Sequence, residues 1–334
     1  MRNIIYILIA VVFLSCERSN PDFLGGSLND QFGELLVLDS LKSSASDFNF
    51  LSSSPRFFEA QWSKNLNWQL DVVGTQSGAT KTFTGFSSQI DFDNTSWNGS
   101  ANDFPSFLTE NCVATLFLAD NVDTITMSTT ITITDLKPLQ EDLMLVADFE
   151  QGMPVNTIEF VQQGESMTFD IESGQAASGL SYYAMGGIVN WDYYLGSIKV
   201  PVETEEFSNV SPLLLYFNMA VIGGVAGEVP GNQFIKIYMR EDDGERYSYE
   251  LNPVDWDSWR LISVPYSDFV LESDAANNTK DPGTINQIEI MSLSCPSGPG
   301  TIVGGGSACP ENMGLEVKTN IDFIAFSTNE SYQP

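Results

Sequence analysis

Hydrophobic and polar residues alternate along much of the chain with the period of a β-strand. The clearest run is DTITMSTTITIT, residues 123–134, where Ile125, Met127, Ile131 and Ile133 fall on one face and threonines dominate the other. A strand with this alternation buries one face and exposes the other. No stretch shows the 3, 4, 7 spacing of a long amphipathic helix. The pattern therefore predicts an all-β protein.

The strand-like runs form a first group within residues 31–137. Gly, Asn and Ser turns separate them, and they comprise 66–74, 80–92, 97–100, 113–119 and 123–134. Several short strands with such turns are typical of an Ig-like sandwich. The segment LKPLQED, residues 136–142, carries a proline and three charged residues, and we expect the domain boundary there.

A second group of runs occupies residues 143–330. It begins with LMLVADFE (143–150), and its further runs are 211–221, 232–240, 246–251, 259–265, 286–293 and 320–326. The Asp-Gly pair in EDDGE (241–245) supplies the positive φ angle of a tight hairpin. Because no helical pattern connects the runs, the sequence favours an antiparallel β-jelly-roll sandwich over a parallel α/β fold.

Two predicted strands, 213–221 and 234–240, carry polar and aromatic side chains opposite their apolar set. The residues on that face are Tyr216, Asn218, Lys236, Tyr238 and Arg240, with Gln287 and Glu289 of a later strand as neighbours. Sugars present hydroxyls at the ring edge and C–H groups on the ring faces, so they need aromatic rings beside planar donors and acceptors. We interpret this face as a sugar-binding surface, and an ordinary solvated face is the alternative.

Aromatic residues also cluster in predicted loops. NWDYYLG (190–196) contains Trp191, Tyr193 and Tyr194, and a second loop contains Trp256. Trp259 begins a predicted strand, so we expect it in the core. Exposing several aromatic rings in a polar loop is costly unless they bind something. We therefore expect at least one loop aromatic to contact a ligand, although Trp191 capping the sandwich would also explain the cluster.

Carboxylates are numerous, but no pair can be assigned acid and nucleophile roles from the sequence. Asp242, Asp243 and Glu245 lie in the predicted hairpin and read as solvated charge. Glu150 and Asp322 lie at the two ends of the second domain, where the first and last strands of such sandwiches often meet. Their oxygens could share a structural Ca²⁺ ion.

The charge balance narrows the choice of partners. The chain has 14 basic and 44 acidic residues, for a net charge of −30, and it has no histidine. A basic footprint that could neutralise phosphates is missing, so we expect no nucleic-acid partner. The lack of histidine excludes Ser-His-Asp and Cys-His hydrolases and histidine-bound zinc, whereas carboxylate chemistry of the glycosidase type stays open. With no assignable carboxylate pair, we expect a protein that is not an enzyme.

The N-terminus reads as an export signal. Arg2 is followed by eleven apolar residues, 4–14, which are too few for a membrane span, and then by Ser15 and Cys16. The FLSC sequence resembles the lipobox of bacterial lipoproteins, which implies a signal peptide over residues 1–15 and a lipid on Cys16; an ordinary signal peptide is the alternative. Residues 16–30 then form a polar tether to the first domain.

The other cysteines fit an exported protein. Cys295 and Cys309 bracket thirteen residues rich in Gly and Pro. A disulfide between them is the natural interpretation and would contribute ~3 kcal/mol, with a metal pair as the weaker alternative. Cys112 is left over, and we expect a buried free thiol.

Several motifs of the second domain are similar to those of one family. They are LVADFEQG (145–152), SGLSYYAMGG (178–187), NWDYY (190–194), NQFIKIYMRED (232–242), WDSWRLISVPYSDF (256–269) and NIDFIAF (320–326). They resemble carbohydrate-binding jelly rolls of the galactose-binding type, in particular the C-terminal domain of Bacteroidota surface glycan-binding proteins. Trp259 to Phe269 is the most specific part. The resemblance implies that aromatic residues near Trp191 and Tyr193 form the glycan platform.

This resemblance also implies a cellular role. Such proteins sit on the outer membrane, capture polysaccharide and pass it to hydrolases and a TonB-dependent transporter complex. We therefore expect a non-catalytic, lipid-anchored cell-surface protein that binds polysaccharide or oligosaccharide and supports its capture and uptake. The alternative is a structural lipoprotein that holds a protein partner in an outer-membrane transport or secretion complex.

Overall fold

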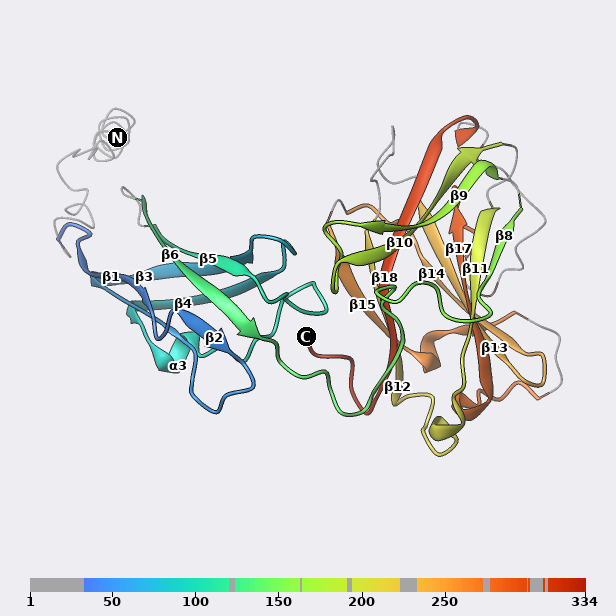
Figure 1. The fold of residues 1–334 in the computed structure, drawn as a ribbon, viewed down its shortest axis with the longest axis horizontal. Coiled ribbons are helices and arrows are strands. Elements are labelled where there is room, and N and C mark those ends of the chain that lie inside the picture. The colour runs from blue at the N-terminus through green and yellow to red at the C-terminus, as the bar shows by residue number, and fades with distance from the viewer. Residues whose placement is uncertain are drawn as a thin grey trace, which may run out of the picture.

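The computed structural model consists of two β-domains that follow one another along the chain (Figure 1). It describes residues 33–119, 124–162, 164–190, 194–222, 233–256, 258–272, 277–298, 300, 309 and 312–334. Cys16, Trp191 and Tyr193 lie outside the described residues. Strands make up most of the described chain, which confirms the all-β prediction. Over the described ranges, no helix has the length and apolar character needed to cross a membrane.

The N-terminal domain is built from six strands in one hydrogen-bonded sheet. They are β1 (Val37–Ser43), β2 (Asp47–Asn49), β3 (Phe58–Gly74), β4 (Thr80–Ile90), β5 (Asn111–Ala119) and β6 (Thr124–Asp135). The long β3 pairs with β4 on one edge, and on the other edge first with β1 and then with β5. The strand order is β1-β3-β5-β6-β2, and only the short β2 runs parallel to its neighbour.

The core of this domain follows from the alternation in its strands. In β6 the predicted inner positions are the less exposed ones, with Ile131 and Ile133 fully buried. The predicted strand at 97–100 is wrong: Trp97 makes only an isolated bridge to Arg56, and a turn follows. The Trp97 ring instead packs edge-on against Phe107, with centroids 5.1 Å apart, next to the short helix α3 (Phe92–Thr95).

The C-terminal domain is a sandwich of two antiparallel sheets. The first sheet has the order β15-β12-β18-β10-β9, with β7 also paired to β18, and its strands are β7 (Leu143–Ala147), β9 (Gly164–Ser173), β10 (Ser181–Val189), β12 (Leu215–Ile222), β15 (Arg260–Pro265) and β18 (Glu316–Thr328). The second sheet has the order β16-β14-β13-β17-β11-β8, and its strands are β8 (Ile158–Val161), β11 (Tyr194–Pro201), β13 (Phe234–Glu241), β14 (Arg246–Leu251), β16 (Val270–Leu271) and β17 (Ile285–Leu293).

The hydrophobic core of the sandwich lies between its two sheets. The predicted apolar sets of β12 and β13 pack there, led by Phe217 and Met219 from the first sheet and Ile235 and Ile237 from the second. Because strand side chains alternate, the residues between them point to the outer faces of the sandwich. The polar and aromatic side chains that could bind a ligand therefore lie on the two outer faces of the sandwich.

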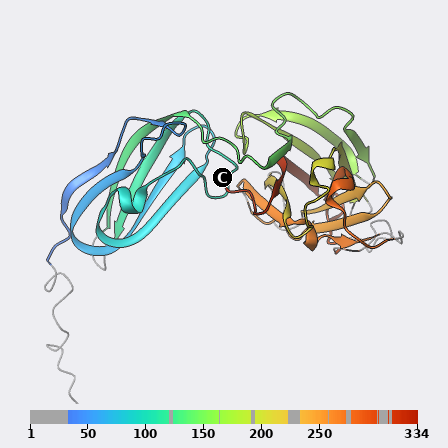
Figure 2. The same cartoon turned by 90° about the horizontal axis from the view of Figure 1, so that it is seen from below.

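The outer face of the first sheet packs against the N-terminal domain. Trp259, Phe323 and Tyr332 belong to the same hydrophobic cluster as the core of that domain. The Leu261 N–H donates to the Asp103 carbonyl (2.6 Å), and the Tyr332 hydroxyl donates to the Pro105 carbonyl (3.1 Å). The C-terminus accordingly ends between the two domains (Figure 2). The two domains thus share an apolar contact, which could not be predicted by analysing the sequence of each domain separately.

Candidate functional site

The predicted sugar-binding face is divided between the two sheets. Tyr216 and Asn218 lie in β12 of the first sheet, whereas Lys236, Tyr238 and Arg240 lie in β13 of the second. The prediction that they share one surface is wrong, because strands that face each other across a sandwich point their outer side chains in opposite directions. Each face has to be considered by itself.

On the first sheet, Asn218 is buried and hydrogen-bonded within the protein. Its Oδ1 accepts from the Ser263 hydroxyl (2.6 Å) and from the Tyr332 N–H (3.3 Å), and its Nδ2 donates to the Ser327 hydroxyl (3.0 Å). Tyr216, its neighbour on this face, is half-buried. Asn218 therefore fastens the C-terminal segment to the sheet.

On the second sheet, Lys236 and Tyr238 belong to a buried network around Glu272. The Lys236 ammonium lies 2.5 Å from Glu272 Oε1, and both side chains are fully buried. The hydroxyls of Tyr238 and Ser248 also donate to this carboxylate. Burial, followed by the hydrogen bond to Glu272, raises the pKa of Tyr238. These side chains hold the fold together and are not open to a ligand.

The segment after Cys295 covers this part of the second sheet. The Lys236 ammonium also donates to the Ser297 hydroxyl and the Gly298 carbonyl (3.0 Å each), and the Gly300 N–H donates to the Ser248 hydroxyl. A disulfide joins Cys295 to Cys309, with Cα atoms 5.9 Å apart. The disulfide therefore joins the two ends of the Gly/Pro-rich segment.

The rest of the second sheet's outer face is partly open and carries cations above buried carboxylates. The Arg240 guanidinium, 29% exposed, lies 2.5 Å from the buried Glu289, and Lys199 lies 3.6 Å from it. Arg240 and Arg246 also lie within 5.7 Å of the Tyr238 ring centroid. Each of these cations has a carboxylate or an aromatic ring beside it.

Two of the aromatic residues predicted to lie in loops, Tyr194 and Trp256, belong to the described residues. Tyr194 is not in a loop: it begins β11, is buried, and its hydroxyl donates to Ser197 Oγ (3.0 Å). Trp256 lies in a loop but is half-buried, donates its indole N–H to the Val221 carbonyl (2.9 Å) and packs under the Arg260 guanidinium. Both rings are thus occupied by intramolecular contacts.

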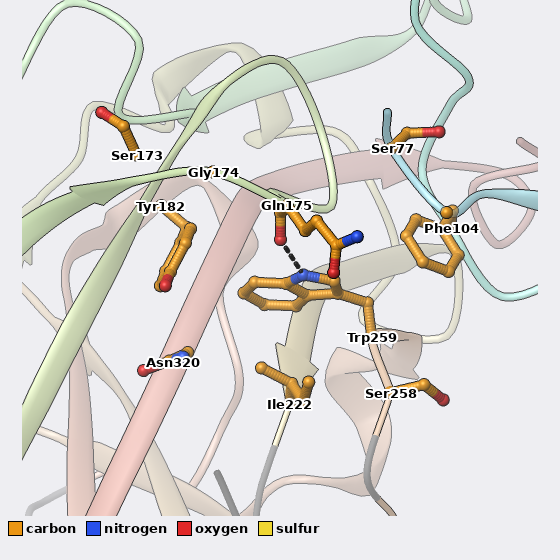
Figure 3. A pocket seen from close by; sticks show the side chains of 11 residues that line it. Ser77, Phe104, Ser173, Gly174, Gln175, Tyr182, Ile222, Ser258, Trp259 and Asn320 are labelled. Atoms are coloured by element: carbon orange, nitrogen blue, oxygen red, sulfur yellow. Dashed lines mark hydrogen bonds between the residues drawn. The ribbon is translucent and has the colours of Figure 1, made fainter. Parts of the chain in front are cut away.

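A pocket of about 450 Å³ lies where the two domains meet, and we call it the interdomain pocket (Figure 3). The residues that line it are Ser77, Gly78, Phe104, Ser173, Gly174, Gln175, Tyr182, Ile222, Ser258, Trp259 and Asn320. The first three belong to the N-terminal domain and the others to the sandwich. This volume lies in the range of small-molecule sites, which often occur at domain boundaries.

Trp259 occupies the middle of the interdomain pocket, with the Tyr182 ring to one side (Figure 3). The two ring centroids are 5.5 Å apart in an edge-to-face arrangement. The indole N–H donates to the Gln175 carbonyl (2.7 Å), which fixes the orientation of the ring. The Tyr182 hydroxyl is held in turn by Glu172 (2.7 Å). The aromatic parts of the pocket are therefore oriented before any ligand arrives.

Amides and hydroxyls complete the lining. Asn320, on β18, is only 3% exposed, and its Oδ1 has no hydrogen-bond partner in the described part of the chain. Gln175, in the β9–β10 turn, has an exposed side chain. Among the described residues, the lining contains no carboxylate. A buried acceptor without a donor is unfavourable by itself, so Asn320 is suited to a ligand that brings a hydroxyl.

Glu150 and Asp322 both bind the segment that precedes β10. Glu150 Oε1 accepts from the N–H groups of Leu180 (2.7 Å) and Ser181 (2.6 Å), and Asp322 Oδ2 accepts from that of Ser178 (2.8 Å). Burial raises the pKa of Asp322 to about 8, and the charge of Glu150 adds to the shift. Carboxylate oxygens are ligands that Ca²⁺ prefers, and a Ca²⁺ ion at this pair stays a prediction.

Cys112 is a buried free cysteine in β5. Burial, followed by the charge of Glu110, raises the pKa of the Cys112 thiol to about 12. The thiol is therefore protonated at neutral pH and unreactive.

The sequence interpretation missed the interdomain pocket. It assigned Trp259 to the core of the second domain. Trp259 is buried, but it packs with the core of the N-terminal domain. Tyr182 lies within the motif SGLSYYAMGG (178–187) and Gln175 shortly before it, but nothing in the local sequence marks either residue as part of a site. No local pattern could have indicated that a second domain closes over the outer face of the first sheet.

Comparison with known proteins finds likeness in structure only. No protein-family model matches the sequence, and no curated protein is detectably similar to it. The chain is similar to a family 11 carbohydrate-binding module from Clostridium thermocellum, solved with a β-1,3-1,4-mixed-linked tetrasaccharide, at 17% identity and a TM-score of 0.38, over 56% of this chain and 95% of that one. A surface glycan-binding protein from Prevotella bryantii, PbSGBP-B, matches at 11% identity and a TM-score of 0.36, over 89% of this chain and 77% of that one.

A third similar structure is the CBM22-1-CBM22-2 tandem domain of Xyn10C from Paenibacillus barcinonensis. It matches at 10% identity and a TM-score of 0.33, over 89% of this chain and 93% of that one. Identities and TM-scores this low do not transfer a ligand, so the proposal below rests on the geometry of this chain.

Proposed function

We propose that the protein is a non-catalytic glycan-binding protein that holds a sugar unit of a polysaccharide in the interdomain pocket. The observation that carries the proposal is Asn320 Oδ1, a buried acceptor for which the described residues offer no donor, in a pocket that also contains Trp259 and Tyr182. A sugar hydroxyl would donate to this oxygen, while C–H groups of the ring would pack on the aromatic side chains.

The chemistry of the pocket favours binding over hydrolysis. Glycoside hydrolysis commonly needs two carboxylates that flank the bond. The described residues that line the interdomain pocket offer hydroxyls, amides and aromatic rings, and none of them is an acid. Sugar bound there would be held and released unchanged.

The proposed cellular role follows from the N-terminal sequence. A lipid on Cys16 would anchor the protein to the outer membrane, and residues 17–30 would allow the two domains to reach captured polysaccharide. In this role the protein delivers glycan to a TonB-dependent transporter complex at the cell surface. Replacing Cys16 by Ala should release the protein from the membrane fraction.

A Ca²⁺ ion at Glu150 and Asp322 is part of the proposal. It would neutralise the buried Asp322 and fix the segment 177–181, which leads from the Gln175 side of the pocket into β10. Its role is structural. Asp322→Asn should abolish any rise in the melting temperature that Ca²⁺ produces through this pair.

Affinity electrophoresis against a broad panel of soluble polysaccharides tests the function. We expect at least one glycan to retard the native protein, and Gln175→Ala to reduce the retardation. Gln175 is exposed, so its truncation leaves the fold intact. Arg240→Ala, on the other outer face, is the matched control and should bind as the native protein does.

Two results would contradict the proposal in different ways. If no glycan in the panel retards the native protein, the function is wrong. If a glycan does and Arg240→Ala loses the retardation while Gln175→Ala keeps it, the protein binds glycan on the second sheet, and the pocket is the wrong site.

A second candidate function is the binding of a protein partner, and β8 favours it. This edge strand of the second sheet exposes Ile158, Phe160 and Val161. An exposed apolar edge can accept a strand from another chain. A pull-down from detergent extracts that recovers a stoichiometric partner, from the native protein and from Gln175→Ala alike, would support this function.

A further inference from the structure

Three carboxylates gather at the hairpin that joins β13 to β14. Glu241 ends β13, Asp243 lies in the exposed turn, and Glu245 follows Gly244, whose φ of +90° allows the tight turn. One oxygen from each of the three carboxylates lies within 4.8 Å of the others. Two oxygens that share a Ca²⁺ ion at 2.3–2.6 Å lie at most about 5 Å apart. The three oxygens are therefore close enough to bind the same ion.

One carboxylate of this cluster has a buried oxygen that lacks a partner in the described part of the chain. Glu241 is 2% exposed, and its Oε1 accepts from the Tyr266 hydroxyl and from the Asp281 N–H (2.7 Å each). Glu241 Oε2 is buried and has no hydrogen-bond partner in the described part of the chain. Because burying a carboxylate oxygen unpaired is costly, Oε2 points to a ligand from outside the polypeptide.

The local charge is only partly compensated. The charge of Lys280 acts on Glu241, but the Lys280 ammonium donates to the Ser267 carbonyl (2.5 Å) and stands over aromatic rings. A cation bound among the three carboxylates would reduce the repulsion between them.

A purely structural role explains two of the three carboxylates. Glu245 Oε1 accepts from the N–H groups of Asn277 (3.0 Å) and Asn278 (2.8 Å), and Asp243 Oδ2 accepts from the Asn277 side-chain amide (2.6 Å). These bonds hold the loop that precedes Asp281 against the hairpin. They leave Glu241 Oε2 unexplained, and that oxygen distinguishes a cation site from a hydrogen-bonded acidic turn.

We propose that Glu241, Asp243 and Glu245 bind a Ca²⁺ ion, which fixes residues 277–281 against the β13–β14 hairpin. Ligands that are all oxygen suit Ca²⁺ and not the softer transition metals. The site is separate from the Glu150 and Asp322 pair, and it does not depend on whether the protein binds glycan.

Calorimetric titration of the purified protein with Ca²⁺ tests the site. Asp243→Asn changes one exposed side chain in the turn, and Asp242→Asn is its matched control, since Asp242 is the adjacent acid in the same turn and bonds Asn286 instead. We expect Asp243→Asn to remove one equivalent of bound Ca²⁺, or to weaken its binding at least tenfold. The Asp242→Asn variant should bind as the native protein does.

Terbium luminescence locates the ion independently. The hydroxyls of Tyr247 and Tyr266 donate to Glu245 and Glu241, so both rings are near enough to sensitise bound Tb³⁺. We expect Glu241→Gln, which keeps an acceptor oxygen, to reduce the tyrosine-excited emission severalfold. Absence of Ca²⁺ binding by the native protein would overturn the proposal, and so would equal binding by Asp243→Asn and Asp242→Asn.

Discussion

The two outer faces of the sandwich use the same types of side chain for opposite purposes. On the second sheet, Lys236 and Tyr238 both contact the Glu272 carboxylate, and these buried side chains satisfy one another's polar groups. On the first sheet, Trp259 and Tyr182 stand in the interdomain pocket beside Asn320, whose Oδ1 has no partner in the described residues. Satisfied groups stabilise a fold, whereas an unsatisfied group in a pocket is available to a ligand.

The largest expected effect comes from breaking the network of the second sheet. Glu272→Ala leaves the Lys236 ammonium without its carboxylate, and both side chains are fully buried. Removing one partner of a buried ion pair costs about 3–5 kcal/mol. We expect a loss of this size in the free energy of unfolding, measured with urea. A loss under about 1 kcal/mol would mean that the network is not what stabilises this face.

A smaller effect is expected where the two domains meet. Tyr332→Ala removes a buried ring that packs on Phe323, with centroids 5.0 Å apart, and a hydroxyl bound to Pro105. We expect it to cost about 3 kcal/mol and to make residues 136–142 more susceptible to limited proteolysis. Tyr332→Phe is the control and should cost only about 1 kcal/mol, the value of one hydrogen bond. Equal proteolysis of Tyr332→Ala and the native protein would argue against a stable domain contact.

The smallest effect on stability is expected at Asn320, where a substitution should separate glycan binding from folding. Asn320→Leu replaces an unpaired buried acceptor by an apolar side chain of similar size. We expect the free energy of unfolding to stay within about 1 kcal/mol of the native value, or to rise, because Asn320 Oδ1 accepts no hydrogen bond from the described residues. Glycan binding should nevertheless fall at least tenfold. A loss of more than about 2 kcal/mol in a urea titration would show that Asn320 has a structural partner.

Much of the fold could be predicted from the sequence because alternation reports which strands have one buried face. The run at 246–251 is β14 without a change of boundary, and the Asp-Gly turn is the hairpin it indicates. The predicted runs contain no counterpart of β8, β9, β10 and β11. Nearly all of β11 and much of β10 are buried, so they lack alternation, and β10 contains two glycines.

The candidate site was less predictable than the fold. Alternation placed Lys236, Tyr238 and Arg240 on one outward face correctly. It could not tell that Glu272, Ser297 and Gly298 would contact Lys236 there. It also could not tell that another domain covers the outer face of the first sheet. Which outward face stays open is decided by contacts between distant parts of the chain, and these leave no local pattern.

The most direct test of which face binds is hydrogen–deuterium exchange with the best glycan from the panel. If the interdomain pocket is the site, bound glycan should slow exchange in residues 173–182, in 258–261 and in the turn at 77–79. Exchange in β13 should not change. Protection confined to β13 and β11, with none around Trp259, would contradict the account and assign the glycan to the second sheet.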